Sequence, residues 1–258
     1  MSIEFKKENG VATIALNRPD VFNSFNREMA LAVIAALADC ETDNEVRCIV
    51  LTGNGKAFCA GQDLNEAIDP NNGITFEVIL NEHYNPIVRR VRNIEKPVIA
   101  AVNGVAAGAG ANIALACDFA VASKKASFTQ AFSKIGLVPD SGGTFFLPRL
   151  VGLQRATAMM MLSDKMSAEE AERIGLIYKA VEEEDFKTFI TDLSLKLANM
   201  PTKALGMTKR LINAGFDNNL DQQLDMEGSL QIIAGESYDY QEGVNAFLEK
   251  RAPKFKGE

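Results

Sequence analysis

The segment at residues 98–117 constrains the fold most, because it contains no charged side chain over twenty residues. Its length alone matches a membrane-spanning helix. Its glycines and the polar Asn103 and Asn112 argue against a membrane helix. The pattern instead predicts a buried strand at 98–102, a turn, and a buried helix from Gly108 to Cys117.

Further predicted strands and helices alternate on both sides of this segment. Apolar runs at 11–16, 46–52 and 119–122 predict strands, and nearly continuous hydrophobicity is typical of strands covered on both faces. Asn26 is a suitable N-cap for a helix over residues 27–39. This alternation indicates right-handed crossover units and therefore an α/β fold.

Two other parts of the chain have a different character. The polar stretch 67–73 predicts an irregular loop, followed by a helix that carries Ile79, His83 and Val88. After Pro201 the pattern is helical almost to the end, with apolar stripes but little core of its own. We therefore expect this last part to pack against the sheet and against other subunits.

Composition excludes several classes of function. The formal net charge is −7 and no Lys/Arg block occurs, which argues against nucleic-acid or anionic-membrane binding. Cys40, Cys48, Cys59 and Cys117 lack metal-type spacing and predict reduced, buried thiols in a cytoplasmic protein without a secretory signal. His83 is the single histidine, so a His-rich zinc site is excluded, and a packing role is favoured over catalysis.

Small residues gather at two turns that follow predicted strands, at 56–64 and at 103–112. Such residues allow a ligand to approach the backbone, so that main-chain N–H groups face it. At the second turn those donors lie at a helix N-terminus, where the dipole favours negative charge. Two amides that converge on one oxygen form an oxyanion hole, worth about 3–4 kcal/mol per donor. The same composition also suits tight packing alone.

Asp140 is the candidate general base. It follows Pro139 and lies among the apolar residues Leu137, Val138, Phe145 and Phe146. Apolar surroundings raise the pKa of a carboxyl group toward neutrality, which suits proton abstraction. The competing interpretation is that Asp140 caps a helix that begins near Gly142, and the residues alone favour capping.

Five segments together resemble the crotonase superfamily, also called the enoyl-CoA hydratase/isomerase family, over nearly the whole chain. They are NRP at 17–19, FCAGQDL at 58–64, NGVAAG at 103–108, CD at 117–118 and GLVPDSGG at 136–143. The resemblance implies an acyl-CoA substrate and a spiral of ββα units. It also implies a core with the active site at residues 1–200 and a helical trimerisation region at 201–258. A homotrimer, or a hexamer built as a dimer of trimers, is expected.

The resemblance also assigns roles to individual residues. The thioester oxygen would accept hydrogen bonds from the backbone N–H groups of Ala60 and Ala109. No metal or redox cofactor is expected, because the CoA thioester is itself the substrate. The residues expected to bind substrate or CoA are Ala60, Gly61, Gln62, Asp63, Leu64, Gly108 and Pro139, with Phe247 and Lys250 reaching the CoA of a neighbouring subunit.

Two departures from the family pattern bear on the chemistry. Enoyl-CoA hydratases carry glutamates at two positions that align with Asn112 and Phe132 here. Neither residue is an acid or base at neutral pH, so two-carboxylate addition of water is not supported. One carboxylate, Asp140, beside an oxyanion hole is the minimum for an isomerase. The similarity is greatest to the branch that converts ring-1,2-epoxyphenylacetyl-CoA to oxepin-CoA in phenylacetate catabolism and also shifts Δ3 double bonds to Δ2.

Alternatives remain open at this stage. A fatty-acid Δ3,Δ2-enoyl-CoA isomerase would use the same residues on a linear acyl chain, and an enoyl-CoA hydratase would need an acid or base not yet identified. A dehalogenase-like hydrolase would use an aspartate in the same loop as a nucleophile. A non-enzymatic CoA-binding or RNA-binding protein is disfavoured by the negative charge.

Overall fold

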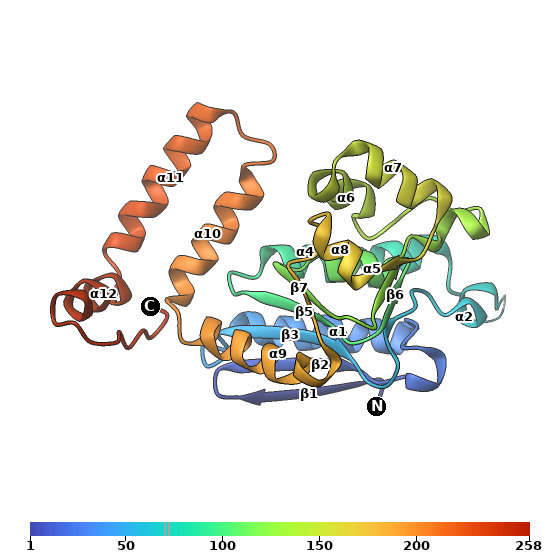
Figure 1. Ribbon diagram of the computed structural model, residues 1–258, viewed down its shortest axis with the longest axis horizontal. Coiled ribbons are helices and arrows are strands. Elements are labelled where there is room, and N and C mark those ends of the chain that lie inside the picture. The colour runs from blue at the N-terminus through green and yellow to red at the C-terminus, as the bar shows by residue number, and fades with distance from the viewer. Residues whose placement is uncertain (70, 72) are drawn as a thin grey trace.

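The computed structural model describes residues 1–69, 71 and 73–258, and Figure 1 shows a layered body from which a helical arm extends. Six strands form the larger sheet of the body, in the order β1-β2-β3-β5-β7-β10. β1 is antiparallel to β2, and the other neighbouring pairs are parallel. The strands are β1 (Ile3–Glu8), β2 (Val11–Leu16), β3 (Cys48–Gly53), β5 (Val98–Val102), β7 (Phe119–Ser123) and β10 (Lys179–Val181).

A second sheet has four short strands in the order β4-β6-β8-β9. Its members are β4 (Ala57–Cys59), β6 (Val105–Ala107), β8 (Ser127–Thr129) and β9 (Met166–Ser167). The first three are parallel, and β9 pairs antiparallel with β8. Successive turns of the chain thus place β3, β5 and β7 in the large sheet and β4, β6 and β8 in the small one. The predicted α/β class and spiral of ββα units are confirmed.

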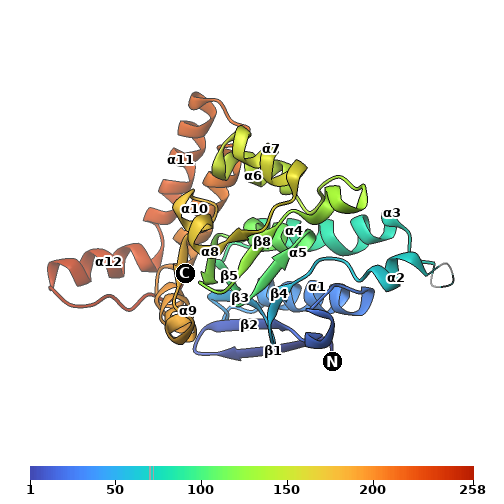
Figure 2. The same cartoon turned by 45° about the vertical axis from the view of Figure 1, so that its right-hand side comes forward.

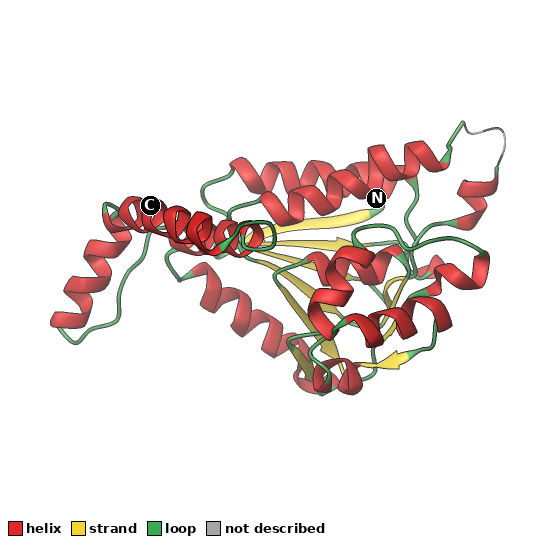
Figure 3. Cartoon of the chain, turned by 90° about the horizontal axis from the view of Figure 1, so that it is seen from above, coloured by secondary structure: helices red, strands yellow, loops and turns green. Residues whose placement is uncertain are grey.

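Helices cover both faces of the large sheet (Figure 3). Because side chains alternate along a strand, neighbouring residues of β3 enter different cores. Ile49 packs in the cluster that includes residues of α1 (Arg27–Thr42) and α4 (Asn85–Asn93). Val50 packs in the cluster that includes residues of α9 (Glu183–Ala198).

The charge-free segment contains the predicted strand, β5, and the predicted buried helix, α5 (Ala109–Ala116), whose eight residues are all buried. The part expected to be a turn also contains the short strand β6. Among the described residues, no helix is long and apolar enough to cross a membrane. The four cysteines are free and buried, as predicted. The Asn26 cap is also confirmed, because its side chain accepts the Met29 N–H at 3.0 Å.

The predicted loop at 67–73 includes residues 70 and 72, which lie outside the described residues, while Ala67 and Ile68 belong to α2. The single helix expected after it is divided by a π-helix at Ile79–Tyr84, in which His83 is buried. The remaining helices are short or belong to the arm. They are η1 (Pro19–Val21), α2 (Leu64–Ile68), α3 (Phe76–Val78), η3 (Ala131–Ile135), α6 (Gly143–Val151), α7 (Leu153–Leu162), α8 (Ala168–Arg173), α10 (Thr202–Ala214), α11 (Leu220–Gly235) and α12 (Tyr238–Leu248).

Helices α10, α11 and α12 form an arm that extends from the sheets in both Figure 1 and Figure 2. Lys209 anchors its base, because the buried Nζ donates to Asp118 Oδ2 at 2.8 Å and to the Val91 carbonyl oxygen at 2.6 Å. Farther along, α11 buries Leu230 but leaves several apolar side chains exposed. These exposed side chains are Leu220, Leu224, Ile232 and Ile233.

Candidate active site

Two turns meet where β4 and β6 end, because these strands pair in parallel. Gly61 has φ +94°, and a Cβ there would lie 3.1 Å from the Ala107 carbonyl oxygen and 3.6 Å from the Ala109 nitrogen. A Cβ on Gly110 would lie 2.4 Å from the Cys59 carbonyl oxygen, closer than real contacts allow. The small residues noted in the sequence are therefore required for this close approach of two backbone segments.

Ala109 offers a main-chain donor at this junction. It is the first residue of α5, and its N–H has no acceptor among the hydrogen bonds of the described residues. The first N–H groups of a helix lack intrahelical partners and lie at the positive end of the dipole. The Phe132 ring lies next to the preceding residue, 3.8 Å from a Cβ built on Gly108. Ala109 thus presents an amide suited to an oxyanion.

Ala60, the other expected donor, is already occupied, since its N–H donates to the Phe22 carbonyl oxygen at 3.0 Å. Gln62, two residues on, forms a parallel bridge with Phe25, in which the Asp63 N–H donates to the Phe25 carbonyl at 2.8 Å. This geometry directs the Gln62 N–H away from Phe25, and the described part of the chain gives it no acceptor. The structure therefore does not support Ala60 as a donor and offers Gln62 in its place.

Tyr84, which the sequence did not single out, fixes the Gln62 side chain. Its hydroxyl donates to Gln62 Oε1 at 2.8 Å, and its ring packs edge-on against Phe25 with centroids 5.7 Å apart. Burial raises the pKa of Tyr84 well above its usual value, and the negative charge of Asp140 adds to the effect. Tyr84 is therefore a neutral donor that lies within the electrostatic reach of Asp140.

Asp140 lies half-buried between η3 and α6. Burial raises the pKa of its carboxyl to about 6, and a hydrogen bond from Ser141 Oγ to Oδ1 at 2.9 Å opposes part of this rise. Such a carboxylate is ionised at neutral pH and accepts a proton more readily than an exposed aspartate. Asp140 is therefore ionised at neutral pH and is also a stronger base than an exposed aspartate.

The capping interpretation of Asp140 is not supported. The N-cap residue of α6 is Gly142, with no side-chain cap hydrogen bond. The Gly143 N–H donates to the main-chain carbonyl of Asp140 at 2.9 Å, not to its carboxylate. The Asp140 carboxylate therefore does not cap α6.

The two positions that hold glutamates in hydratases both lie close to this site. Asn112 is fully buried in α5, and its Nδ2 donates to the Asp140 carbonyl oxygen at 2.8 Å. Phe132 is buried with its ring near Gly108. Cys59 is adjacent, but burial raises the pKa of its thiol to about 12, so it stays protonated. Asn112, Phe132 and Cys59 therefore add no second ionised acid or base beside Asp140.

Other predicted binding residues have mixed outcomes. Asp63 is committed to structure, because its carboxylate pairs with Arg18 at 2.8 Å and caps α2 through the Asn65 N–H at 3.1 Å. Leu64 is exposed at the start of α2, and Pro139 is half-buried directly before Asp140. These residues remain candidates for contact with CoA.

Phe247 and Lys250 lie at the far end of the arm, where Phe247 is 83% exposed. Figures 1 and 2 both place α12 at the opposite end of the molecule from α2. Within one chain they are not brought to the site. A contact between these residues and CoA therefore requires a neighbouring subunit.

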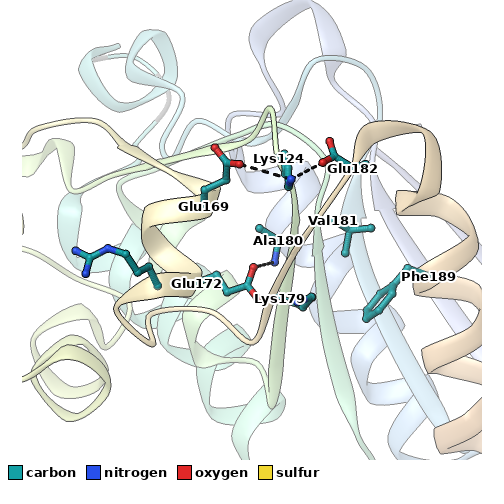
Figure 4. Close-up of a pocket in the computed structure, with 9 residues that line it drawn as sticks. Lys124, Glu169, Glu172, Lys179, Ala180, Val181, Glu182 and Phe189 are labelled. Carbon is teal, nitrogen blue, oxygen red and sulfur yellow. Dashed lines mark hydrogen bonds and ion pairs between the residues drawn. The ribbon is translucent and has the colours of Figure 1, made fainter.

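A separate surface pocket lies between α8, β10 and α9 (Figure 4). Lys124 there pairs with Glu182 and with Glu169, the latter at 3.6 Å, and Glu172 pairs with Lys179 at 2.8 Å. Each of these five charged side chains is therefore already held in an ion pair. Among the described residues, no group of three or more His, Cys, Asp or Glu side chains is arranged to hold a metal.

The layered spiral, the paired turns and the half-buried aspartate agree with the enzyme family that the sequence resembles. Residues 6–258 match the family model described as enoyl-CoA hydratase/isomerase, and the chain belongs to this family. It is 48% identical over 252 residues to the 1,2-epoxyphenylacetyl-CoA isomerase of Escherichia coli (strain K12), covering 97% of this chain and 96% of that protein.

Two further relatives carry the hydratase name. The chain is 46% identical to a "Probable enoyl-CoA hydratase" of Rhodobacter capsulatus, covering 99% of this chain and 98% of that protein. The crystal structure of an enoyl-CoA hydratase from Bacillus anthracis superposes with a TM-score of 0.92 at 32% identity, covering 100% of both chains. The family and the fold are therefore shown, and both isomerases and hydratases occur among its relatives.

Proposed function

We propose that this protein is an acyl-CoA isomerase that uses Asp140 as its single base and converts 1,2-epoxyphenylacetyl-CoA to oxepin-CoA. The observation that carries the isomerase assignment is the Asp140 carboxyl, raised in pKa to about 6, at a site where Asn112 and Phe132 occupy the hydratase glutamate positions. The similarity to the Escherichia coli isomerase supports the aromatic substrate.

In the proposed reaction Asp140 removes a proton from the carbon next to the thioester carbonyl. Charge then develops on the thioester oxygen, where the N–H groups of Ala109 and Gln62 would donate to it. Each such donor contributes about 10²–10³ in rate. Asp140 returns the proton to the rearranged acyl group, so a 3-enoyl-CoA leaves as a 2-enoyl-CoA. The thioester supplies the acidity, and the scheme needs no metal or redox cofactor.

The hydratase alternative needs a second acid or base to place water on the double bond. Asn112 is an amide and Phe132 is apolar, so neither supplies one. A fatty-acid Δ3,Δ2-enoyl-CoA isomerase uses the same steps and differs only in the acyl group. A dehalogenase-like hydrolase would instead form an aryl ester on Asp140, which a quenched single turnover detects by mass.

Product analysis tests the proposal. We expect chromatography to show oxepin-CoA from the epoxide and 2-enoyl-CoA from a 3-enoyl-CoA, with no 3-hydroxyacyl-CoA. Asp140→Asn should reduce both by at least about a hundredfold. Asp192→Asn, on the exposed surface of α9, is the matched control and should keep wild-type rates. Accumulation of 3-hydroxyacyl-CoA would make the protein a hydratase.

We also propose that the protein assembles as a homotrimer, or as a hexamer of two trimers, through the arm. The exposed apolar residues of α11 and α12 support this, because an isolated chain would leave them in water. Assembly would also let Phe247 and Lys250 of one subunit approach the CoA of the next.

A further inference from the structure

Both polar atoms of the buried Asn112 amide have a hydrogen-bond partner. Its Nδ2 donates to the Asp140 carbonyl oxygen at 2.8 Å, and its Oδ1 accepts from Gln130 Nε2 at 2.8 Å. A Cβ on Gly143 would lie 2.4 Å from Asn112 Nδ2, so the amide occupies the space a larger residue would need. Asn112 is therefore packed directly against the backbone that carries the base.

The orientation of both amides follows from chemistry. A carbonyl oxygen can only accept, so Asn112 must present Nδ2 to Asp140 and consequently Oδ1 to Gln130. Gln130, which is 2% exposed, must then present Nε2. Its own backbone carbonyl accepts from Ser163 Oγ at the end of α7. Ser163 thus holds the Gln130 backbone, and the Gln130 side chain holds Asn112, which donates to Asp140.

The loop at the end of this chain adopts an unfavourable backbone conformation. Ser141 has φ +52° and Gly142 has φ +77°, two successive left-handed residues directly after Asp140. A non-glycine residue in this region costs about 1 kcal/mol or more, and it persists only when surrounding contacts fix it. The Asp140 carbonyl supplies such a contact, since it accepts from both Gly143 N–H and Asn112 Nδ2.

We propose that Asn112, held by Gln130, is a positioning residue that fixes the Asp140 loop so that the carboxylate points at the acyl group. This rests on the proposed function, in which Asp140 is the base. Asn112 does not exchange protons. It acts through the Asp140 backbone, and its loss should weaken the chemical step more than substrate binding.

Asn112→Asp tests this by replacing one amide nitrogen with oxygen. The new carboxylate, when ionised, cannot donate to the Asp140 carbonyl, so at pH 8 we expect kcat to fall about thirtyfold while KM changes less than about threefold. The protonated form of the new side chain can donate again, so the deficit relative to wild type should narrow as the pH falls. The matched control is Asn199→Asp, an exposed asparagine whose Nδ2 also donates to a backbone carbonyl, at 2.8 Å, on α9.

A second variant covers the case in which Asn112→Asp does not fold. Gln130→Met removes the donor to Asn112 Oδ1 but keeps the side-chain length, and we expect kcat to fall about threefold to tenfold at nearly constant KM. Wild-type kcat in a folded Asn112→Asp protein, or in Gln130→Met, overturns the inference. If Asp140→Asn abolishes isomerase activity but Asn112→Asp retains it, the positioning role of Asn112 is wrong and the proposed function stands. Absence of isomerase activity in the wild type overturns the proposed function.

Discussion

The pH dependence of turnover tests whether the Asp140 carboxyl is the base. Its pKa is raised to about 6 chiefly by burial. Because the base must be ionised, we expect kcat to fall as the pH drops through 6, to about one-eleventh of its plateau at pH 5. A carboxyl at the ordinary value of 3.8 would stay about 94% ionised at pH 5 and lose almost nothing.

Initial rates between pH 4.5 and 8.5 provide the assay. Both kcat and kcat/KM are needed, because phosphate groups such as those of CoA titrate near pH 6 themselves. Ser141→Ala sharpens the test, since the Ser141 hydroxyl stabilises the ionised carboxylate by a hydrogen bond of 2.9 Å. Its loss, worth about 1 kcal/mol, should move the inflection up by about 0.7 unit. A flat wild-type profile down to pH 5, or an inflection unmoved in Ser141→Ala, would refute the reasoning.

Three further predictions concern stability and assembly. Burial raises the pKa of Asp140 in the folded protein above its unfolded value, so its charge destabilises the fold once the pH exceeds about 6. Asp140→Asn should therefore raise the free energy of unfolding by about 1–2 kcal/mol at pH 8 and hardly at all at pH 4. Urea denaturation at both pH values measures this. Lys209→Met removes the 2.8 Å ion pair with Asp118, which keeps Arg92 at 3.5 Å and the Val98 N–H, so the free energy of unfolding should fall by about 1–3 kcal/mol. An unchanged melting temperature would contradict this. Leu224→Glu places a charge on the exposed face of α11 and should weaken assembly, which lowers the sedimentation coefficient. If the wild type is already a monomer, the variant will sediment like the wild type, and the prediction is wrong.

Much of the architecture could be predicted from local patterns. The charge-free segment at 98–117 indicated a strand, a turn and a buried helix, and the structure places β5, β6 and α5 there. The helix predicted for residues 27–39 extends to Thr42. Its last turn still buries Cys40, and no residue in the sequence signals the end of the helix. The periodicity after residue 73 could not reveal the π-helix, whose hydrogen-bond pattern differs but whose composition does not.

The candidate site was harder to predict because its amides depend on distant contacts. Whether Ala60 or Gln62 has a free N–H is decided by Phe22 and Phe25, which lie far earlier in the chain. Asn112 was predicted only to lack acid or base chemistry, and nothing in the sequence indicated that its amide holds the carbonyl of Asp140. For Asp140 the residues alone favoured a helix cap, and the resemblance to the family favoured the base; the structure shows no cap hydrogen bond from its side chain to α6.

The most direct test of the central claim is proton NMR of a 3-enoyl-CoA incubated in heavy water with wild-type protein and with Asp140→Asn. A one-base isomerase predicts the 2-enoyl isomer from the wild type, no 3-hydroxyacyl signal, and at least about a hundredfold slower conversion in the variant. Rapid hydration by both proteins would contradict the account and remove Asp140 from the chemistry.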